Sequence, residues 1–271
     1  MDTKSQFISQ QPSNNFLSTL VDEFFYLDIN TSELAMKNEP IIPFPRITFG
    51  YFFEHPFTVV NHTLGQTATF NIGISRISTD QISVEPATDR IRIVGAHAKP
   101  YFLAYLTKNP IHTMPWPVHT EENFSNIAAN FKKKIDTCET PEEMFSEIEN
   151  FLLENILTRD LSIIAAAVEL IEKNEGKIRL HNLSQQLSVS ERTIRNQFSD
   201  HIGCSPKEYI RLVRLKQVVY DMKNSSDSLT SIAYENDYFD QAHFVHELKN
   251  ITGKVPNDLR KKIPDFRFLQ F

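Results

Sequence analysis

The sequence predicts an α+β protein, with an antiparallel β-rich N-terminal domain followed by an all-α C-terminal domain. The first half contains runs of β-branched and aromatic residues bounded by Pro, Gly or Asn, which is typical of strands. The second half has apolar residues at helical spacing and repeats one pattern, which indicates a supersecondary unit used twice. A length of 271 residues allows two such domains.

The predicted N-terminal domain covers residues 16–158. The spacing of about ten residues between its β-rich runs favours a small barrel or sandwich. A short helix is expected over Pro100–Leu106. Residues 1–15 are polar and lack the apolar segment of a signal peptide, so we expect a flexible tail. The runs that predict strands are Ile47–Phe53, Phe57–Asn61, Ala68–Ser75 and Arg90–Val94.

Two helices are expected to close this domain. The first starts at Asn123, where apolar residues recur at i, i+3, i+4 and i+7. The second starts at Thr140, an N-cap residue that is followed by Pro141 and by Glu143 at the third helical position. The pair either connects the two domains and offers a dimer surface or packs on the β-rich domain itself.

Charge is divided unequally between the two predicted domains. Residues 159–271, the predicted C-terminal domain, hold 17 Lys and Arg against 15 Asp and Glu, whereas residues 1–158 hold 11 against 19. An acidic half joined to a mildly basic half fits a sensor joined to a nucleic-acid-binding domain. No apolar run approaches the roughly 18 residues that span a bilayer, so no membrane association is expected.

Signals for catalysis or for a bound cofactor are weak. Cys138 and Cys204 lie in different halves, which fits a reducing cytoplasm and argues against a disulfide framework or a cysteine zinc site. The sequence has no phosphate-binding loop and no nucleophile motif, so we expect neither an enzyme, nor a metal, nor a cofactor. Trp116 either closes a ligand pocket or caps the core. The N-terminal histidines lack metal-ligand spacing and are His55, His62, His97, His112 and His119.

The repeat in the C-terminal domain has a period of fifty residues. Upstream of its turn the shift is forty-nine, so one residue has been inserted at the turn of the second copy. Each copy reads as helix, turn, helix, which predicts two helix-turn-helix units at about residues 177–203 and 227–253. We call these the first unit and the second unit. The matched pairs are Leu183 with Ile232, Ile194 with Phe244, Phe198 with Leu248, Gly203 with Gly253, and Pro206 with Pro256.

In the first unit, Ser190 is expected to cap a helix over Glu191–Asp200. Arginine and asparagine side chains reach guanine and adenine edges, and the first turns of a recognition helix are where base contacts occur. The alternative is an ordinary solvated helix face. The residues predicted to face DNA are Arg192, Thr193, Arg195 and Asn196.

In the second unit, Asp240 is expected to cap a helix that runs to Asn250. Its outward residues are poorer in base-reading groups, and Glu247 is expected near them, where it would repel phosphate. We therefore expect this helix to contribute affinity and fit more than sequence choice. The outward residues are Gln241, Ala242, Val245 and His246.

A long connecting helix over Pro206–Lys223 is predicted to hold the two units at a fixed separation. Its candidates for neutralising phosphates are Lys207, Arg211, Arg214 and Lys216, with ordinary surface charges as the alternative.

Residues 165–262 resemble the DNA-binding domain of the AraC/XylS family of bacterial transcription regulators. The resemblance implies seven helices with both recognition helices in adjacent major-groove segments, and base contacts at the positions named above. The sequence departs from the family where Ser188 and Asp237 replace the turn glycines, and where Leu248 and Leu259 replace aromatic residues. The matching motifs are Tyr209-Ile210-x-x-x-Arg214-Leu215, Ile232-Ala233, Tyr238-x-Asp240, His243-Phe244, Lys249, Gly253-x-x-Pro256 and Arg260.

The N-terminal half resembles a sensor-like domain found before such DNA-binding domains, through Ile93-Val94-Gly95, Pro100 and the apolar helix that follows. These patterns together predict a cytoplasmic, sequence-specific transcription regulator that binds a double-stranded DNA operator. Its N-terminal domain senses a small molecule or forms a homodimer, and RNA polymerase is a further candidate partner. Two alternatives stay open: a ligand-independent dimeric regulator, and an enzyme whose β-domain is tethered to DNA. The effector, the ligand-binding residues and the sign of regulation are not encoded in a recognisable motif.

Overall fold

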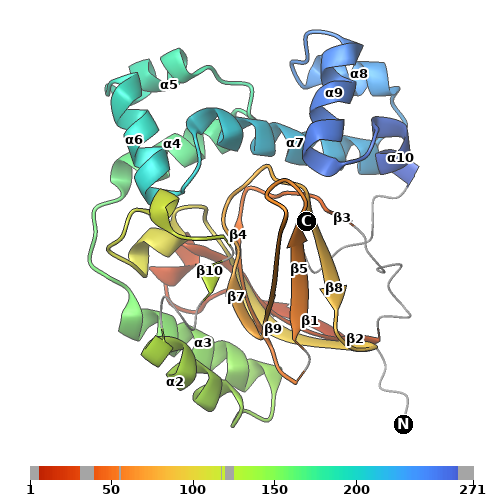
Figure 1. Ribbon diagram of the computed structural model, residues 1–271. Helices are drawn as coiled ribbons and strands as arrows, with labels where there is room; N and C mark the ends of the chain where they lie inside the picture. The colour runs from red at the N-terminus through yellow and green to blue at the C-terminus, as the bar shows by residue number, and fades with distance from the viewer. Residues whose placement is uncertain (1–5, 31–39, 55, 117, 120–124, 262–271) are drawn as a thin grey trace.

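The computed structural model describes residues 6–30, 40–54, 56–116, 118–119 and 125–261. It has a β-rich N-terminal part and a helical C-terminal part that lies across one end of it (Figure 1). The predicted α+β class is confirmed. No helix within the described ranges is both long and apolar enough to cross a membrane.

The N-terminal domain consists of two antiparallel sheets. The six-stranded sheet has the order β1-β2-β9-β4-β7-β10 and the four-stranded sheet has the order β3-β8-β5-β6. The strands of the first are β1 (Gln6–Gln10), β2 (Val21–Asn30), β9 (Arg90–Ala98), β4 (Ile47–Phe52), β7 (Ile72–Ile74) and β10 (Val118–His119). Those of the second are β3 (Pro40–Ile41), β8 (Ile82–Pro86), β5 (Phe57–Asn61) and β6 (Gln66–Phe70).

The run predicted as one strand over residues 68–75 is divided between the two sheets. Asn71 separates β6 from β7, and its side-chain amide donates hydrogen bonds of 3.0 Å to the carbonyl oxygens of Phe52 and Phe53. These bonds hold the chain where it passes from one sheet to the other. Residues 68–75 look like one continuous strand in the sequence, but they form the corner at which the chain crosses from the small sheet to the large one.

Alternation along β9 shows which layer each face of the large sheet contacts. Ile91 and Ile93 belong to the core shared with the small sheet. Val94, Ala96 and Ala98 belong to the core shared with the helices. The period of two between side-chain directions in a strand explains this division.

The helices α2 (Ser125–Ile135) and α3 (Pro141–Asn155) cover that second face. The helix start predicted at Asn123 lies outside the described residues. The capping box at Thr140 is confirmed, because its hydroxyl accepts from the backbone N–H of Glu143. Phe131, Phe145 and Ile148 are fully buried, so the pair packs on its own β-domain.

The segment predicted as a flexible tail is ordered in its described part. β1 pairs with β2 along its whole length, from Gln6 opposite Asp28 to Gln10 opposite Phe24. Glu149 of α3 then accepts hydrogen bonds from the backbone N–H groups of Ser13 and Asn14. A polar composition suggested fraying, but strand pairing and one carboxylate hold the segment in place.

Seven helices form the described part of the C-terminal domain, and α7 joins its two halves (Figure 1). Short 3-10 helices, including η3 (Phe102–Tyr105) and η4 (Ile111–Thr113), lead from the sheets towards it. η3 lies within the helix predicted at Pro100–Leu106. The helices are α4 (Ser162–Lys173), α5 (Leu180–Leu187), α6 (Glu191–His201), α7 (Pro206–Asn224), α8 (Leu229–Glu235), α9 (Gln241–Thr252) and α10 (Pro256–Lys261).

The two helix-turn-helix turns have the same backbone path up to the inserted residue. Ser188 and Asp237 occupy the turn position in the left-handed region, with φ of 54° and 55°. The next N–H groups, of Val189 and Tyr238, donate to the carbonyls of Ser184 and Ala233. The N-caps then follow at once in the first unit, at Ser190, and one residue later in the second, at Asp240. Phe239 is therefore the extra residue, and it is 87% exposed.

The two units belong to different hydrophobic cores. The core of the first unit, with Ile194 and Phe198 fully buried, is continuous with that of the N-terminal domain. The core of the second unit, with Phe244 and Leu248 fully buried, is separate, and among the described residues of the N-terminal part only Ile42 belongs to it. The four residues predicted to anchor the recognition helices are thus confirmed as buried.

Candidate nucleic-acid interface

The recognition helix of the first unit is α6. The hydroxyl of Ser190 accepts from the backbone N–H of Thr193 at 3.0 Å, as the sequence predicted, and fixes where the helix starts. Ile194 and Phe198 bury one face completely. The opposite face is left to solvent at the end of the helix where base contacts are made in this motif.

The four predicted DNA-facing residues of α6 lie together on that face. Arg192, Arg195 and Asn196 are exposed, and Thr193 is half-buried with its hydroxyl 2.9 Å from that of Ser190. Arg195 Nη2 is 2.7 Å from Glu191 Oε2 one turn earlier. Arg192 has no ion-pair or hydrogen-bond partner within the described chain. An exposed i,i+4 pair is worth only about 0.3–0.5 kcal/mol, so Arg195 can leave Glu191 at little cost.

The recognition helix of the second unit is α9. Asp240 caps it by accepting from the backbone N–H of His243 at 2.7 Å. Gln241, Ala242 and His246 are exposed, and Val245 is half-buried against the core. The predicted outward face is therefore accessible, but its only long polar groups are an amide and an imidazole.

Glu247 lies elsewhere than the sequence suggested. Its side chain is only 9% exposed and is bonded by Arg211 Nε at 3.2 Å and by the Tyr238 hydroxyl at 3.1 Å. Burial, with Glu247 beside it, raises the pKa of Tyr238, so the phenol remains a donor. Glu247 is thus an internal connection between α9 and α7, not a surface charge that repels phosphate.

The basic residues predicted along α7 differ in their availability. Lys207, in the first turn, is exposed. Arg211 is paired with Glu247, and Arg214 donates to the carbonyl of Gly176 and lies 5.4 Å from the ring centre of Tyr238. Lys216 is half-buried, with its amine 5.1 Å from the ring centre of Phe44. Three of the four cations therefore hold parts of the protein together.

One loop of the N-terminal domain contacts both units. In the loop between β7 and β8, Arg76 donates to the carbonyl of Gly203 at 3.5 Å, just after α6. Gln81, at the other end of the loop, donates to the carbonyls of Lys249 and Asn250 in α9 at 3.3 and 3.0 Å. Sequence patterns gave no sign of these contacts, because they join segments more than a hundred residues apart.

A charged cluster ties the first unit to the sheets. Arg46 binds Asp22 of β2 and Glu172 of α4, and the Tyr209 hydroxyl of α7 donates to Glu172 at 2.6 Å. Gly203 adds a close contact, since a side chain there would lie 2.8 Å from Ile111 of η4, and its φ of 86° also favours glycine. The first unit is consequently attached by packing, by charge and by the loop contact.

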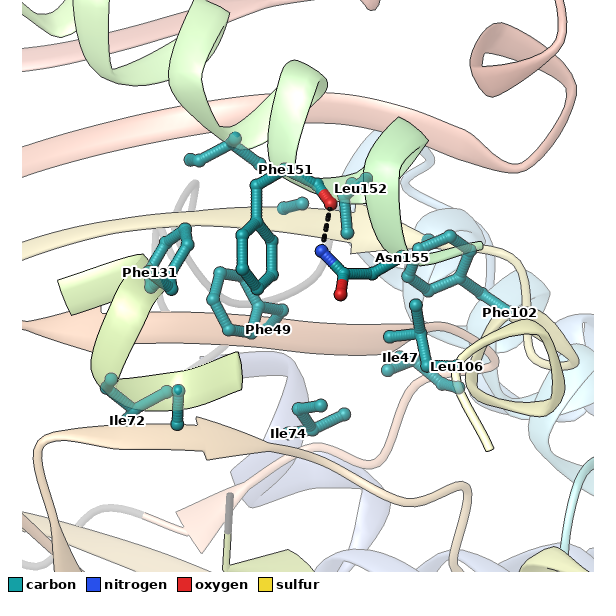
Figure 2. Close-up of a pocket in the computed structure, with 14 residues that line it drawn as sticks. Ile47, Phe49, Ile72, Ile74, Phe102, Leu106, Phe131, Phe151, Leu152 and Asn155 are labelled. Carbon is teal, nitrogen blue, oxygen red and sulfur yellow. Dashed lines mark hydrogen bonds between the residues drawn. The ribbon is translucent and has the colours of Figure 1, made fainter. Parts of the chain in front are cut away.

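Two cavities lie within the N-terminal domain. One of about 50 Å³ lies between the large sheet, η3, α2 and α3, and Asn155, the only polar side chain among the described residues that line it, is bonded to the carbonyl of Phe151 (Figure 2). Another of about 150 Å³ lies between the two sheets and is lined by aromatic rings, including Trp116, and by Arg46 and Arg76. Arg76 Nε is buried without a hydrogen-bond partner among the described residues.

The geometry defines a double helix-turn-helix DNA-binding domain. Residues 183–262 match a protein family described as a helix-turn-helix domain. Together with the motif residues, this shows that the C-terminal domain is a DNA-binding domain of AraC type.

The chain is similar to curated regulators of transcription over part of its length. An uncharacterised HTH-type transcriptional regulator of Haemophilus influenzae is 26% identical over 42% of this chain and 39% of its own length. The HTH-type transcriptional activator RhaS of Pectobacterium atrosepticum is 31% identical over 29% of this chain and 28% of its own length. The match thus spans well under half of each relative, and both are named as regulators of transcription.

Solved structures of ToxT from Vibrio cholerae are also similar to this chain. One has a TM-score of 0.49 and 10% identity over 95% of this chain and 97% of ToxT. Another, of ToxT bound to an unsaturated fatty acid, has a TM-score of 0.49 and 12% identity over 96% of each chain. These values are too low for a function to be transferred from ToxT.

Proposed function

We propose that this protein is a cytoplasmic, sequence-specific DNA-binding transcription regulator. The observation that carries the proposal is the exposed start of α6, where Arg192, Arg195 and Asn196 project from a helix anchored by a fully buried opposite face. These side-chain types form paired hydrogen bonds with guanine and adenine in the major groove. The AraC-type domain around them supports the same conclusion.

In this proposal α6 selects sequence and Lys207 neutralises a phosphate. Arg211 and Arg214 were predicted alongside Lys207, but their internal contacts favour Lys207 as the phosphate contact. The sequence predicts that Gln241, Ala242, Val245 and His246 of α9 also face DNA, but only Gln241 and His246 among them carry polar side chains. Thr193 positions the start of α6 through its bonds with Ser190.

The test uses a duplex selected from a random-sequence library by the full-length protein. Replacing Arg195 and Asn196 with alanine should lower affinity for this duplex by at least tenfold, because each paired base contact is worth about 1–3 kcal/mol of discrimination. Affinity for a scrambled duplex should change far less. Thr230→Ala, at an exposed position on α8, is the matched control. Unchanged affinity and specificity in the double variant would refute the proposal.

Control by a small molecule is supported by the cavity between the sheets. Its aromatic lining fits a flat apolar body, and the Nε–H of Arg76, which has no partner among the described residues, fits a hydrogen-bond acceptor on such a molecule. In a screen of small molecules, a ligand of this cavity should raise the melting temperature of the wild type, because it binds the native state. The shift should be lost in Arg76→Met. A ligand-independent regulator would show no shift with any compound.

Dimer formation and contact with RNA polymerase are further parts of the proposal. The outer faces of α2 and α3 supply the surface for a second copy, with Leu153 40% exposed on α3. Sedimentation of Leu153→Lys and of the wild type would test this: only the wild type should be dimeric. A monomeric wild type at micromolar concentration would argue against the dimer.

A further inference from the structure

The two units differ most in the charge they carry. From Asn224 to Leu248 the sequence has five carboxylates and no lysine or arginine. The equivalent stretch of the first unit, residues 174–198, has four lysines and arginines and two carboxylates. Non-specific DNA affinity comes from cations that neutralise phosphates, so the second unit lacks its main source. The carboxylates are Asp227, Glu235, Asp237, Asp240 and Glu247, and the first-unit cations are Lys177, Arg179, Arg192 and Arg195.

The start of each recognition helix shows the same contrast. A helix N-terminus attracts a phosphate through its free N–H groups and its positive dipole end. In α6 the cap is the neutral Ser190, and the nearby Glu191 is paired with Arg195. In α9 the cap is Asp240, whose carboxylate neutralises the dipole end at the place where a phosphate would bind. Glu235 and Asp237, both exposed, precede it.

Neighbouring arginines do not replace the missing cations. Arg211 is paired with the buried Glu247, and Arg214 is bonded to Gly176. Arg260 of α10 donates to the carbonyls of Asp227 and Ser225 at 2.6 and 2.7 Å. Each of these guanidinium groups joins its helix to another segment of the domain, and moving one to a phosphate would break that contact.

The exposed lysine of α9 is at the wrong end of the helix for a phosphate next to the base-contacting turn. Lys249 lies eight residues after Gln241, which is about 12 Å along the axis at 1.5 Å per residue. Between them the exposed residues of α9 are uncharged or histidine. A phosphate beside the first turn of α9 would therefore meet carboxylates and no cation of that helix.

The inserted residue alters the entrance to α9 as well. Phe239 stands between the turn and Asp240, where the first unit has no residue, and it presents an almost fully exposed ring. The start of α9 is thus displaced by one residue relative to the turn. The start of α9 therefore presents the Phe239 ring and the Asp240 carboxylate, whereas the start of α6 presents the Ser190 hydroxyl.

We propose that each chain holds DNA through the first unit alone, in one segment of the major groove, and that α9 makes no productive contact with the phosphate backbone. The proposal rests on the DNA-binding function proposed above and narrows it. It assigns base selection to α6, and phosphate binding to α6, to Arg179 at the start of α5 and to Lys207. It leaves the acidic second unit as a structural support that stays off the duplex.

Hydroxyl-radical footprinting on the library-selected duplex tests the proposal directly. The expected result is one protected backbone segment per bound chain, with the number of chains taken from the mass of the complex. Two protected segments per chain, one helical turn or about 10 base pairs apart, would overturn it. If the wild type shows no sequence preference at all, the DNA-binding function itself fails, which is a different result.

Salt dependence supplies a second readout. With the four exposed cations Arg179, Arg192, Arg195 and Lys207 in contact, the slope of log affinity against log salt should be about −3.6 per chain, since each neutralised phosphate adds about −0.9. Affinity should then fall by roughly 150-fold between 50 and 200 mM salt. A slope of about −6 or steeper per chain would exceed what the first unit and Lys207 can supply and would contradict the proposal.

Two variants separate the units. Gln241→Ala combined with His246→Ala should change affinity less than twofold, whereas Arg192→Ala should lower it at least tenfold. Asp240→Ser gives α9 the same neutral cap as α6 and keeps the capping hydrogen bond. It should also change affinity less than twofold. A gain of fivefold or more in Asp240→Ser would place the start of α9 beside a phosphate and overturn the proposal.

Discussion

The first and second units share a backbone plan and differ in nearly everything that faces outward. Their turns have matching φ values, matching hydrogen bonds and matching buried residues. Their surfaces carry opposite net charge over equivalent stretches. A repeated fold is therefore maintained by its core, its caps and its turn. Its capacity to bind DNA depends on other positions, which can change while the fold stays the same.

The units also differ in how they are attached. The first is continuous with the N-terminal core, whereas the second has its own core around Leu215, Val218 and Phe244. Destabilising the first unit should therefore affect the whole chain, and destabilising the second should remain local.

The largest effect is expected from matched core truncations. Phe198→Ala should cost about 3–5 kcal/mol and lower the stability of both domains, because its core is shared. Leu248→Ala should cost about 2–5 kcal/mol in the second unit alone. Chemical unfolding followed by circular dichroism reports the helices, and the fluorescence of Trp116, the single tryptophan, reports the N-terminal domain. An equal shift of the Trp116 transition in both variants would contradict the difference between the units.

A smaller effect should distinguish structural from DNA-binding cations. Arg214→Ala should lower stability by about 1–3 kcal/mol, because it removes a charged hydrogen bond to Gly176 and the contact with Tyr238. It should leave the salt slope unchanged. Lys207→Ala should leave stability unchanged and make the slope shallower by about 0.9. If Arg214→Ala flattens the slope instead, Arg214 is a phosphate contact.

The two turns provide the next comparison. Ser188→Gly should stabilise the protein by roughly 1 kcal/mol. A left-handed conformation costs a residue with a Cβ roughly 1–2 kcal/mol, and glycine avoids this cost. Glycine also loses more conformational entropy on folding, which offsets part of the gain. Asp237→Gly should gain less, since aspartate tolerates this conformation better. Unfolding midpoints would measure both, with Ser226→Gly, at an exposed position outside the helices, as the control. Destabilisation by both glycines would refute this account of the turns.

The smallest effect concerns pH and the attachment of the first unit. Burial alone would raise the pKa of Asp22, but the charges of Arg46 and Lys99 outweigh it, so the pKa lies below its ordinary value. The stability this gives is present above about pH 4 and is lost as pH falls through the lower pKa of the folded state. Asp22→Asn should therefore lose less stability than the wild type between pH 5 and pH 3. If the stability of Asp22→Asn and of the wild type fell equally between pH 5 and pH 3, protonation of Asp22 would not contribute to the loss of stability.

Local signals in the sequence predicted much of this structure. Thr140, Ser190 and Asp240 cap the helices expected of them, and the repeat located both units and the buried faces of α6 and α9. Each of these features depends on residues within a few positions of one another. That is why a single sequence contains enough information to find them.

Features that depend on distant partners were missed. β2 was not recognised because residues on both of its faces are buried, so it shows no simple alternation. Glu247 was expected on the surface because its partner Arg211 lies on another helix. The contacts of Arg76 and Gln81 required the folded arrangement of both domains. The base-contacting roles of α6 and α9 remain predictions.

The loop between β7 and β8 has a consequence for how this protein can change over time. Ser75, Arg76 and Ser78 border the cavity between the sheets, while Arg76 and Gln81 hold the ends of α6 and α9. A substitution that adapts the cavity to another molecule therefore also disturbs the mounting of both recognition helices. If the proposed function holds, the preference for a ligand and the preference for an operator depend on the same short segment of chain, so a substitution there changes both.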